Sequence, residues 1–216
     1  MAPVRVLMTG FGPFPGAPSN PSRALVERLS RMRRPSLDGV TIAHHVFPTR
    51  YAAIDRDFRT LIASHDPDII LMFGLAARTR HIRIETRARN LITFFPDAGG
   101  FVPAARTIAA GADDRGLAPS LGIRLLRAAR SYGVKAQFSR DAGRYVCNYA
   151  FWRALELNTS GNRRRMAAFI HIPKIRRPSA KKGRRRPSPG LQDLARTGGA
   201  LLLSLLAMYR RERRAR

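Results

Sequence analysis

Near its start the chain reads Val4-Arg-Val-Leu-Met-Thr-Gly10, and this stretch decides the fold. Its apolar and branched residues predict a buried strand that stops at Thr9-Gly10. A loop rich in Gly and Pro follows, and then a helix over residues 21–32, capped by Ser19 or Asn20. A buried strand followed by a loop and a capped helix is typical of the first unit of a parallel α/β sheet.

The alternation of strands and helices continues along the chain. Further strands are predicted at 40–46, 68–73, 82–88, 134–138 and 166–172, and helices at 50–64, 116–132, 145–156 and 191–210. The stretch 94–103 mixes aromatic with turn residues and is expected to be a loop. This order predicts a three-layer α/β/α fold with a mostly parallel or mixed central sheet, of the phosphorylase/hydrolase-like type.

One domain of this kind accounts for the length of the chain. With 216 residues and 44% hydrophobic content, the chain can bury one substantial core. We expect a catalytic core at 1–173, a basic flexible linker at 174–190, and a C-terminal helix at 191–216 that packs on the same domain and ends in a basic tail. The most apolar window, 198–209, is too short for a membrane span, and the start lacks the pattern of a signal peptide.

The charge balance is strongly positive, since Lys+Arg 40 against Asp+Glu 14 gives a net charge of +26. The basic residues gather at 31–34, 163–165, 174–186 and 210–216, which are predicted loops or ends of elements. Solvated arginines are expected at such places in any case. The positive electrostatic field of these residues attracts nucleic acid or another polyanion. A non-catalytic polyanion-binding scaffold is therefore one alternative for the function.

Cys147 is the only cysteine, so it cannot form an intrachain disulfide, and it is either a structural residue or a nucleophile. A single thiol fits a reducing, cytoplasmic environment. The residue lies at the predicted start of a helix, where the dipole lowers a thiol pKa and free N–H groups can hold an oxyanion. His171 and Glu85 are of the right types to serve as its base and orienting group, but spacing alone does not join the three residues.

Four ordered segments carry a resemblance to a known family. They are Val6-Leu-Met-Thr-Gly-Phe-Gly-Pro-Phe14 with Asn20-Pro-Ser22, Gly74-Leu-Ala76 with Ile82-Arg-Ile-Glu-Thr-Arg-Ala-Arg-Asn90, Ala142-Gly-Arg-Tyr-Val-Cys-Asn148, and Phe169-Ile-His-Ile-Pro173. Together they resemble pyroglutamyl peptidase I, also called pyrrolidone-carboxylate peptidase, a family of cysteine peptidases. The resemblance spans residues 4 to 173.

The resemblance implies a catalytic triad in which Cys147 is the nucleophile, His171 the general base and Glu85 the group that orients the imidazole. The substrate-binding positions that it implies are Phe11, Phe14, Asn20, Thr49, Leu75, Phe95, Tyr145 and Val146. The implied reaction is an omega-peptidase reaction, hydrolysis of the amide bond after an N-terminal pyroglutamyl residue of a peptide through an acyl-enzyme. No metal or other cofactor is expected, because the histidines and the cysteine show no ligand spacing for a metal. The resemblance also implies a homo-oligomer, in particular a tetramer.

The sequence departs from the family around the triad. Leu75 stands where the family has a glutamine, Ala77-Arg78 replaces Gly-Gly, and Thr86 replaces an arginine. The loop before Pro96-Asp97 is about one residue shorter than in the family. These departures leave a second alternative open, namely a hydrolase with the same triad that acts on another cyclic amide or N-acyl substrate.

Overall fold

The centre of the molecule is a six-stranded sheet with the strand order β2-β1-β3-β8-β4-β7. The structure, a computed structural model, describes residues 2–14, 16–157, 165–175 and 189–215. The strands are β1 (Val4–Phe11), β2 (Val40–Phe47), β3 (Ile69–Leu75), β4 (Ile82–Glu85), β7 (Ala136–Ser139) and β8 (Met166–Ile172). Neighbouring strands are parallel except for β4 and β8, which are antiparallel, so the sheet is mixed.

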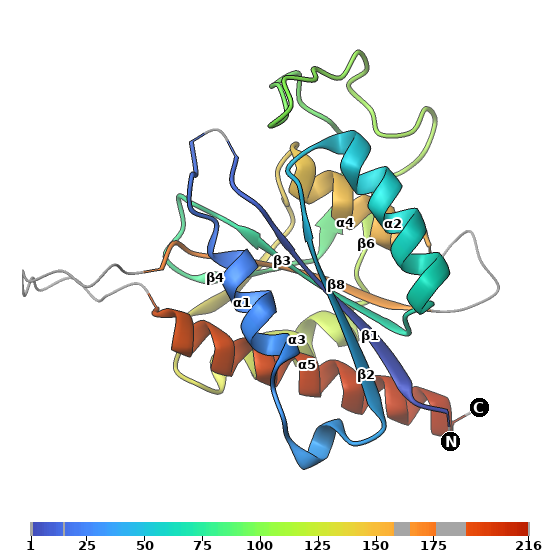
Figure 1. Ribbon diagram of the computed structural model, residues 1–216, viewed down its shortest axis with the longest axis vertical. Helices are drawn as coiled ribbons and strands as arrows, with labels where there is room; N and C mark the ends of the chain where they lie inside the picture. Colours follow the sequence, from blue (N-terminus) through green and yellow to red (C-terminus); the bar gives the residue numbers. More distant parts are fainter. Residues whose placement is uncertain (1, 15, 158–164, 176–188, 216) are drawn as a thin grey trace, which may run out of the picture.

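Helices cover both faces of this sheet, as Figure 1 shows. One face carries α1 (Pro21–Ser30), α3 (Pro119–Arg130) and α5 (Leu191–Arg214), and the other carries α2 (Tyr51–His65) and α4 (Val146–Glu156). Each face has its own buried apolar cluster, because the central strands are apolar on both sides. The predicted three-layer α/β fold is confirmed.

Two smaller elements complete the described structure. A short 3-10 helix, Pro35–Leu37, precedes β2. The strands β5 (Arg87–Ala88) and β6 (Arg115–Gly116) form a two-stranded antiparallel sheet. Because 87–88 pair with β6 and not with the central sheet, the single strand predicted over 82–88 is wrong, and the central strand ends at Glu85.

The first strand is longer than predicted. Thr9 and Gly10 continue to pair with β2, and β1 ends at Phe11, so the expected stop at Thr9-Gly10 is wrong. Gly10 is required for close packing and not for a turn, because a Cβ there would lie 2.7 Å from the carbonyl oxygen of Ser22 in α1. The predicted cap of α1 is confirmed at Asn20, whose side chain accepts a hydrogen bond from the Ser22 N–H.

The remaining elements agree with the prediction to within a few residues. The strand over 166–172 has the predicted limits, and α4 begins at Val146, one residue later than expected. The helix predicted over 116–132 is shorter, since α3 begins at Pro119, and α5 continues to Arg214. The stretch 94–103 has no helix or strand, as predicted.

The C-terminal helix uses part of its basic tail to hold the domain. The guanidinium of Arg210 donates to the carbonyls of Ser36 and Asp38, and that of Arg213 donates to the carbonyl of Ala2. These arginines are therefore engaged in packing. The basic residues 163–164 and 176–188 lie outside the described residues, and the division into 1–173, 174–190 and 191–216 stays a prediction. Among the helices that the structure describes, none has the length and apolarity to cross a membrane.

Candidate active site

The candidate nucleophile lies in the first turn of α4. Cys147 is the second residue of this helix and is half-buried. The helix starts after Gly143, whose φ of 87° is left-handed, and the first donor with an intrahelical partner at this end is the N–H of Tyr149. The N–H groups before it point out of the helix end, as at any helix N-terminus, and they form a donor site beside the thiol.

A buried carboxylate and an imidazole meet on the sheet below this helix. Nδ1 of His171 lies 2.8 Å from Oε1 of Glu85, and both side chains are buried. The contact follows from strand register, because Arg83 of β4 lies opposite His171 of β8, and Glu85 is two residues further along the same face. A carboxylate oxygen only accepts, so the proton of this hydrogen bond belongs to Nδ1 and leaves Nε2 as the basic nitrogen.

Gly74 lets the thiol approach the sheet beside the imidazole. In β3 it lies directly opposite His171 of β8. A Cβ on Gly74 would be 3.0 Å from Sγ of Cys147 and 2.8 Å from the ring of Phe169, which is on the same face of β8 as His171. Neighbouring strands are about 4.8 Å apart. The register and this close approach therefore bring Cys147, His171 and Glu85 to one place in the fold.

Arg83 is a further member of this group that the sequence analysis missed. Its Nε lies 3.0 Å from the same Glu85 oxygen that accepts from His171. The same guanidinium donates to the Ser139 hydroxyl and to the carbonyl of Asp141, at the start of the loop that leads into α4. Alternation along a strand was the available signal, because residues two apart, such as Arg83 and Glu85, share a face.

The surroundings of the thiol favour its protonated form in the resting protein. Burial raises the pKa of Cys147 to about 12, and the negative charge of Glu85 adds to this effect. Burial also raises the pKa values of Tyr51 and Tyr145, and the charges of Asp97 and Cys147 contribute to both shifts. The expectation that the helix start lowers the thiol pKa is therefore wrong for the resting site, where burial outweighs the dipole.

The positions expected to bind substrate fall into two groups. Phe14 and Tyr145 are half-buried and face each other, with ring centroids 6.3 Å apart. Asn20 and Thr49 hold the loop that carries Phe14, since both side chains donate to the carbonyl of Gly12. Tyr145 precedes the first turn of α4 that carries Cys147, so the Phe14–Tyr145 pair forms one aromatic wall at this helix start, and Asn20 and Thr49 act on it through Gly12.

The other four positions are placed differently. Phe11 is 1% exposed and packs against Phe47 and Phe169, with ring centroids 5.8 and 6.1 Å away, so it is a core residue in this structure. Leu75 at the end of β3 and Val146 at the start of α4 are also buried. Phe95 is 58% exposed and lies against Tyr145 from the side of the 91–103 loop.

Two buried polar residues fix the loop that passes over the site. Asn148, the residue after Cys147, donates to the carbonyls of Arg89 and Leu91 and accepts from the Arg89 N–H. Asp97 accepts from the N–H groups of Tyr51, Gly99 and Phe101, and so caps α2 from a distant loop. Sequence reasoning assigned a role to neither residue, although both stood in noted motifs.

No cluster of three or more His, Cys, Asp or Glu suited to a metal ion occurs among the described residues. At the candidate site the side chains that come together are a thiol, an imidazole and a carboxylate. A thiol beside an imidazole that is held by a carboxylate can form and hydrolyse an acyl-enzyme.

Comparison with known proteins agrees with this chemistry. A family model described as pyroglutamyl peptidase matches residues 4–198. A pyrrolidone-carboxylate peptidase of Thermococcus onnurineus is 30% identical over 194 residues, which are 89% of this chain and 94% of that protein. One of Gloeobacter violaceus is 35% identical over 172 residues, 79% of this chain and 82% of that protein. The crystal structure of pyroglutamyl peptidase I from Bacillus amyloliquefaciens has a TM-score of 0.79 at 29% identity and covers 94% of this chain and 97% of its own.

Proposed function

Since this chain belongs to the pyroglutamyl peptidase family, we propose that it hydrolyses the amide bond after an N-terminal pyroglutamyl residue of a peptide. The observation that carries the proposal is the meeting of three side chains. Glu85 holds His171 through Nδ1, and Gly74 opens the sheet next to His171 so that Cys147 can approach. Neither the polyanion scaffold nor another N-acyl substrate is favoured by the family match.

We assign the first half of the reaction as follows. Sγ of Cys147 attacks the carbonyl carbon of the pyroglutamyl residue, and the thiol proton passes to Nε2 of His171. The carbonyl oxygen becomes an oxyanion next to the N–H groups at the start of α4. His171 then gives the proton to the leaving amine as the C–N bond breaks, and the pyroglutamyl group remains as a thioester on Cys147.

The second half reverses the roles. His171 takes a proton from water, the hydroxyl attacks the thioester carbonyl, and the thiolate that leaves recovers the proton from the imidazolium. Glu85 accepts from Nδ1 throughout and stabilises the charged imidazole. Because burial raises the pKa of Cys147 to about 12, proton transfer to His171 has to accompany the attack.

The pyroglutamyl ring is small, flat and neutral, which suits a wall of aromatic rings with a few polar groups. We assign this wall to Phe14 and Tyr145, with Val146 and Leu75 enclosing the site from α4 and β3. Asn20 and Thr49 position the wall by holding Gly12. Phe11, buried beneath, supports it, and Phe95 borders its outer side.

Three finer expectations belong to the same proposal. A single free cysteine suits a reducing compartment, so we place the protein in the cytoplasm. The resemblance implies a homo-tetramer. The net charge of +26 predicts weak binding of polyanions that fades as salt is added.

A reporter assay tests the function. The purified chain should release a fluorescent amine from a pyroglutamyl amide, and Cys147→Ser should lose turnover while it keeps its circular dichroism spectrum. Cys147 is the only cysteine, so the reaction of one iodoacetamide per chain should abolish activity. Saturating substrate should slow this alkylation, because it covers the thiol. Well-folded wild-type protein that cleaves no pyroglutamyl amide between pH 6 and 9 would refute the proposal.

A further inference from the structure

Large exposed apolar side chains are concentrated in one loop. Within the described residues seven such side chains are at least partly open to solvent, and four belong to the loop 94–102. These four are Phe94 (46% exposed), Phe95 (58%), Phe101 (57%) and Val102 (48%). Exposed aromatic rings in a group are typical of a binding surface, because their contact with water is unfavourable until something covers them.

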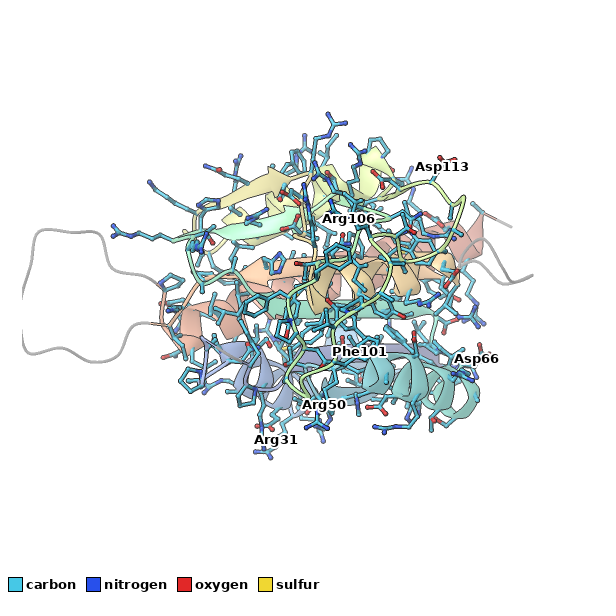
Figure 2. All side chains as sticks on the ribbon, turned by 90° about the horizontal axis from the view of Figure 1, so that it is seen from above. Arg31, Arg50, Asp66, Phe101, Arg106 and Asp113 are labelled. Atoms are coloured by element: carbon cyan, nitrogen blue, oxygen red, sulfur yellow. The ribbon has the colours of Figure 1, made fainter. Side chains whose placement is uncertain are left out.

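The loop is held firmly beside the candidate active site. Thr93 N–H donates to the carbonyl of Arg144, and Ala98 N–H donates to the carbonyl of Thr49. Together with the hydrogen bonds of Asn148 and Asp97, these contacts attach the loop to the start of α4 and the start of α2. Figure 2 looks down on the region that contains this loop, with Phe101 in it and Arg106 in the stretch that follows, and Arg50 of the α2 start lies close to the loop at Gly99.

Aromatic contacts connect the exposed rings to the thiol. The rings of Tyr51 and Tyr145 lie 5.9 Å apart in an edge-to-face contact, Tyr145 caps the start of α4 two residues before Cys147, and all three residues belong to the same apolar cluster. Phe95 lies 6.3 Å from Tyr145, and Phe101 lies 6.4 Å from Tyr51. Each exposed ring is therefore one aromatic neighbour away from the group that surrounds Cys147.

The direction of the substrate decides what such a surface can contact. A pyroglutamyl residue has no residue before it, so all the rest of a peptide substrate lies on the leaving side of the scissile bond. The wall of Phe14 and Tyr145 takes the ring, which leaves the surface outside that wall to the residues that follow.

We propose that Phe95 and Phe101 form a leaving-peptide surface that selects pyroglutamyl peptides with an aromatic or large apolar residue directly after the pyroglutamyl group. The inference rests on the proposed function. An aromatic side chain placed there gains contact with an exposed ring that is already ordered, Phe95 by Tyr145 or Phe101 by Tyr51. A small side chain such as alanine gains little from the same surface.

Hydrolysis of two dipeptide amides tests the preference. For wild-type protein, kcat/KM for pyroglutamyl-phenylalanine amide should exceed kcat/KM for pyroglutamyl-alanine amide by roughly 10-fold. In the double variant Phe95→Ser, Phe101→Ser the ratio should fall to about 2 or less. Tyr132→Ser is the matched control, because Tyr132 is 48% exposed but lies between α3 and the outermost strand β7, and it should keep the wild-type ratio.

The outcomes separate the two proposals. Failure of wild-type protein to hydrolyse either amide refutes the proposed function and this inference with it. Hydrolysis of both at equal kcat/KM, or an unchanged ratio in the double variant, refutes only the leaving-peptide surface. If the double variant instead lowers the mass in sedimentation and leaves the ratio unchanged, the rings form a contact between copies of the chain, and the inference is wrong.

Discussion

Besides the aromatic wall of Phe14 and Tyr145, two regions lie near Cys147, and we call them the inner wall and the outer wall. They are built in opposite ways. The inner wall, formed by Gly74, Glu85, His171 and Asn148, is buried, and its polar groups are held by strand register and short hydrogen bonds. The outer wall is the loop 94–102, which is fastened just before its start through Thr93 and at its middle through Asp97 and Ala98, and which exposes its aromatic rings. The inner wall suits a reaction that needs fixed geometry, whereas the outer wall can change its side chains at little cost to the fold.

This contrast explains where the sequence departs from the family. The triad residues lie on β4, β8 and α4, where one changed side chain disturbs the packing of several others. The departures at Ala77-Arg78 and in the loop 91–103 lie in turns and loops. Leu75, buried at the end of β3, and Thr86, directly after Glu85, lie next to the inner wall and are exceptions. Reaction and substrate choice therefore depend on separate parts of the molecule, and variants in each part should show it.

The largest effect is expected from Glu85→Gln in the inner wall. The amide keeps the shape of the side chain but removes the charge that stabilises the imidazolium, so kcat should fall about 1,000-fold. Steady-state hydrolysis of a pyroglutamyl amide measures this loss. Glu27→Gln is the control, because Glu27 makes an exposed ion pair with Arg23 and should leave kcat unchanged. A fall of less than tenfold in Glu85→Gln would show that the carboxylate does not support the base.

The next largest effect is expected from Asn148→Ala, which should lower the free energy of unfolding. The change removes three hydrogen bonds and leaves buried backbone groups of Arg89 and Leu91 without their partner. The free energy of unfolding should fall by about 3 kcal/mol, measured by urea denaturation. Thr60→Ala, on the exposed face of α2, should change it by less than about 0.5 kcal/mol. Equal effects of the two changes would contradict a rigid inner wall.

The sequence predicted the inner wall better than the outer one. Strand and helix periodicity placed Cys147 at a helix start and His171 in a strand, because local patterns set these elements. Periodicity could not predict that Cys147 and His171 lie close together, and only the resemblance to the family motifs predicted it. The contact itself depends on the antiparallel register of β4 and β8, which is a tertiary property.

Individual errors show where local reasoning fails. The stop expected at Thr9-Gly10 treated glycine as a turn residue, whereas Gly10 serves close packing against α1. Asp97 was seen only as part of a Pro-Asp pair, since nothing in the sequence links it to the N–H of Tyr51.

A smaller loss in the free energy of unfolding is expected at alkaline pH, and it comes from the thiol of Cys147. The pKa of Cys147 is raised from 9.0 to about 12, so above pH 9 the unfolded chain loses the thiol proton that the folded chain keeps. Stability due to this group is complete below pH 9 and is lost as the pH rises toward 12. Between pH 8 and pH 10 the wild type should lose about 1 kcal/mol more than Cys147→Ser in urea denaturation.

The comparison cancels the titrations of groups that do not interact with Cys147. Tyr149, for example, has its pKa raised to about 12 by burial and by Asp55 in both proteins. Tyr51 and Tyr145, whose pKa values the charge of Cys147 raises, contribute to the difference between the two proteins. An equal loss of stability in wild type and Cys147→Ser would mean that the folded thiol ionises as readily as the unfolded one. The folded thiol would then keep its ordinary pKa of 9.0, and burial would not be what holds its proton.

The smallest effect is expected from Phe95→Ser in the outer wall. The ring is 58% exposed, and its one aromatic contact is with Tyr145, so the free energy of unfolding should change by less than about 0.5 kcal/mol. Urea denaturation beside Tyr132→Ser, an equally exposed ring elsewhere, gives the reference. A loss above 1.5 kcal/mol would mean that the 94–102 loop supports the fold as the inner wall does. With a small loss, a changed preference for the leaving residue in this variant comes from contact with the substrate and not from a weakened site.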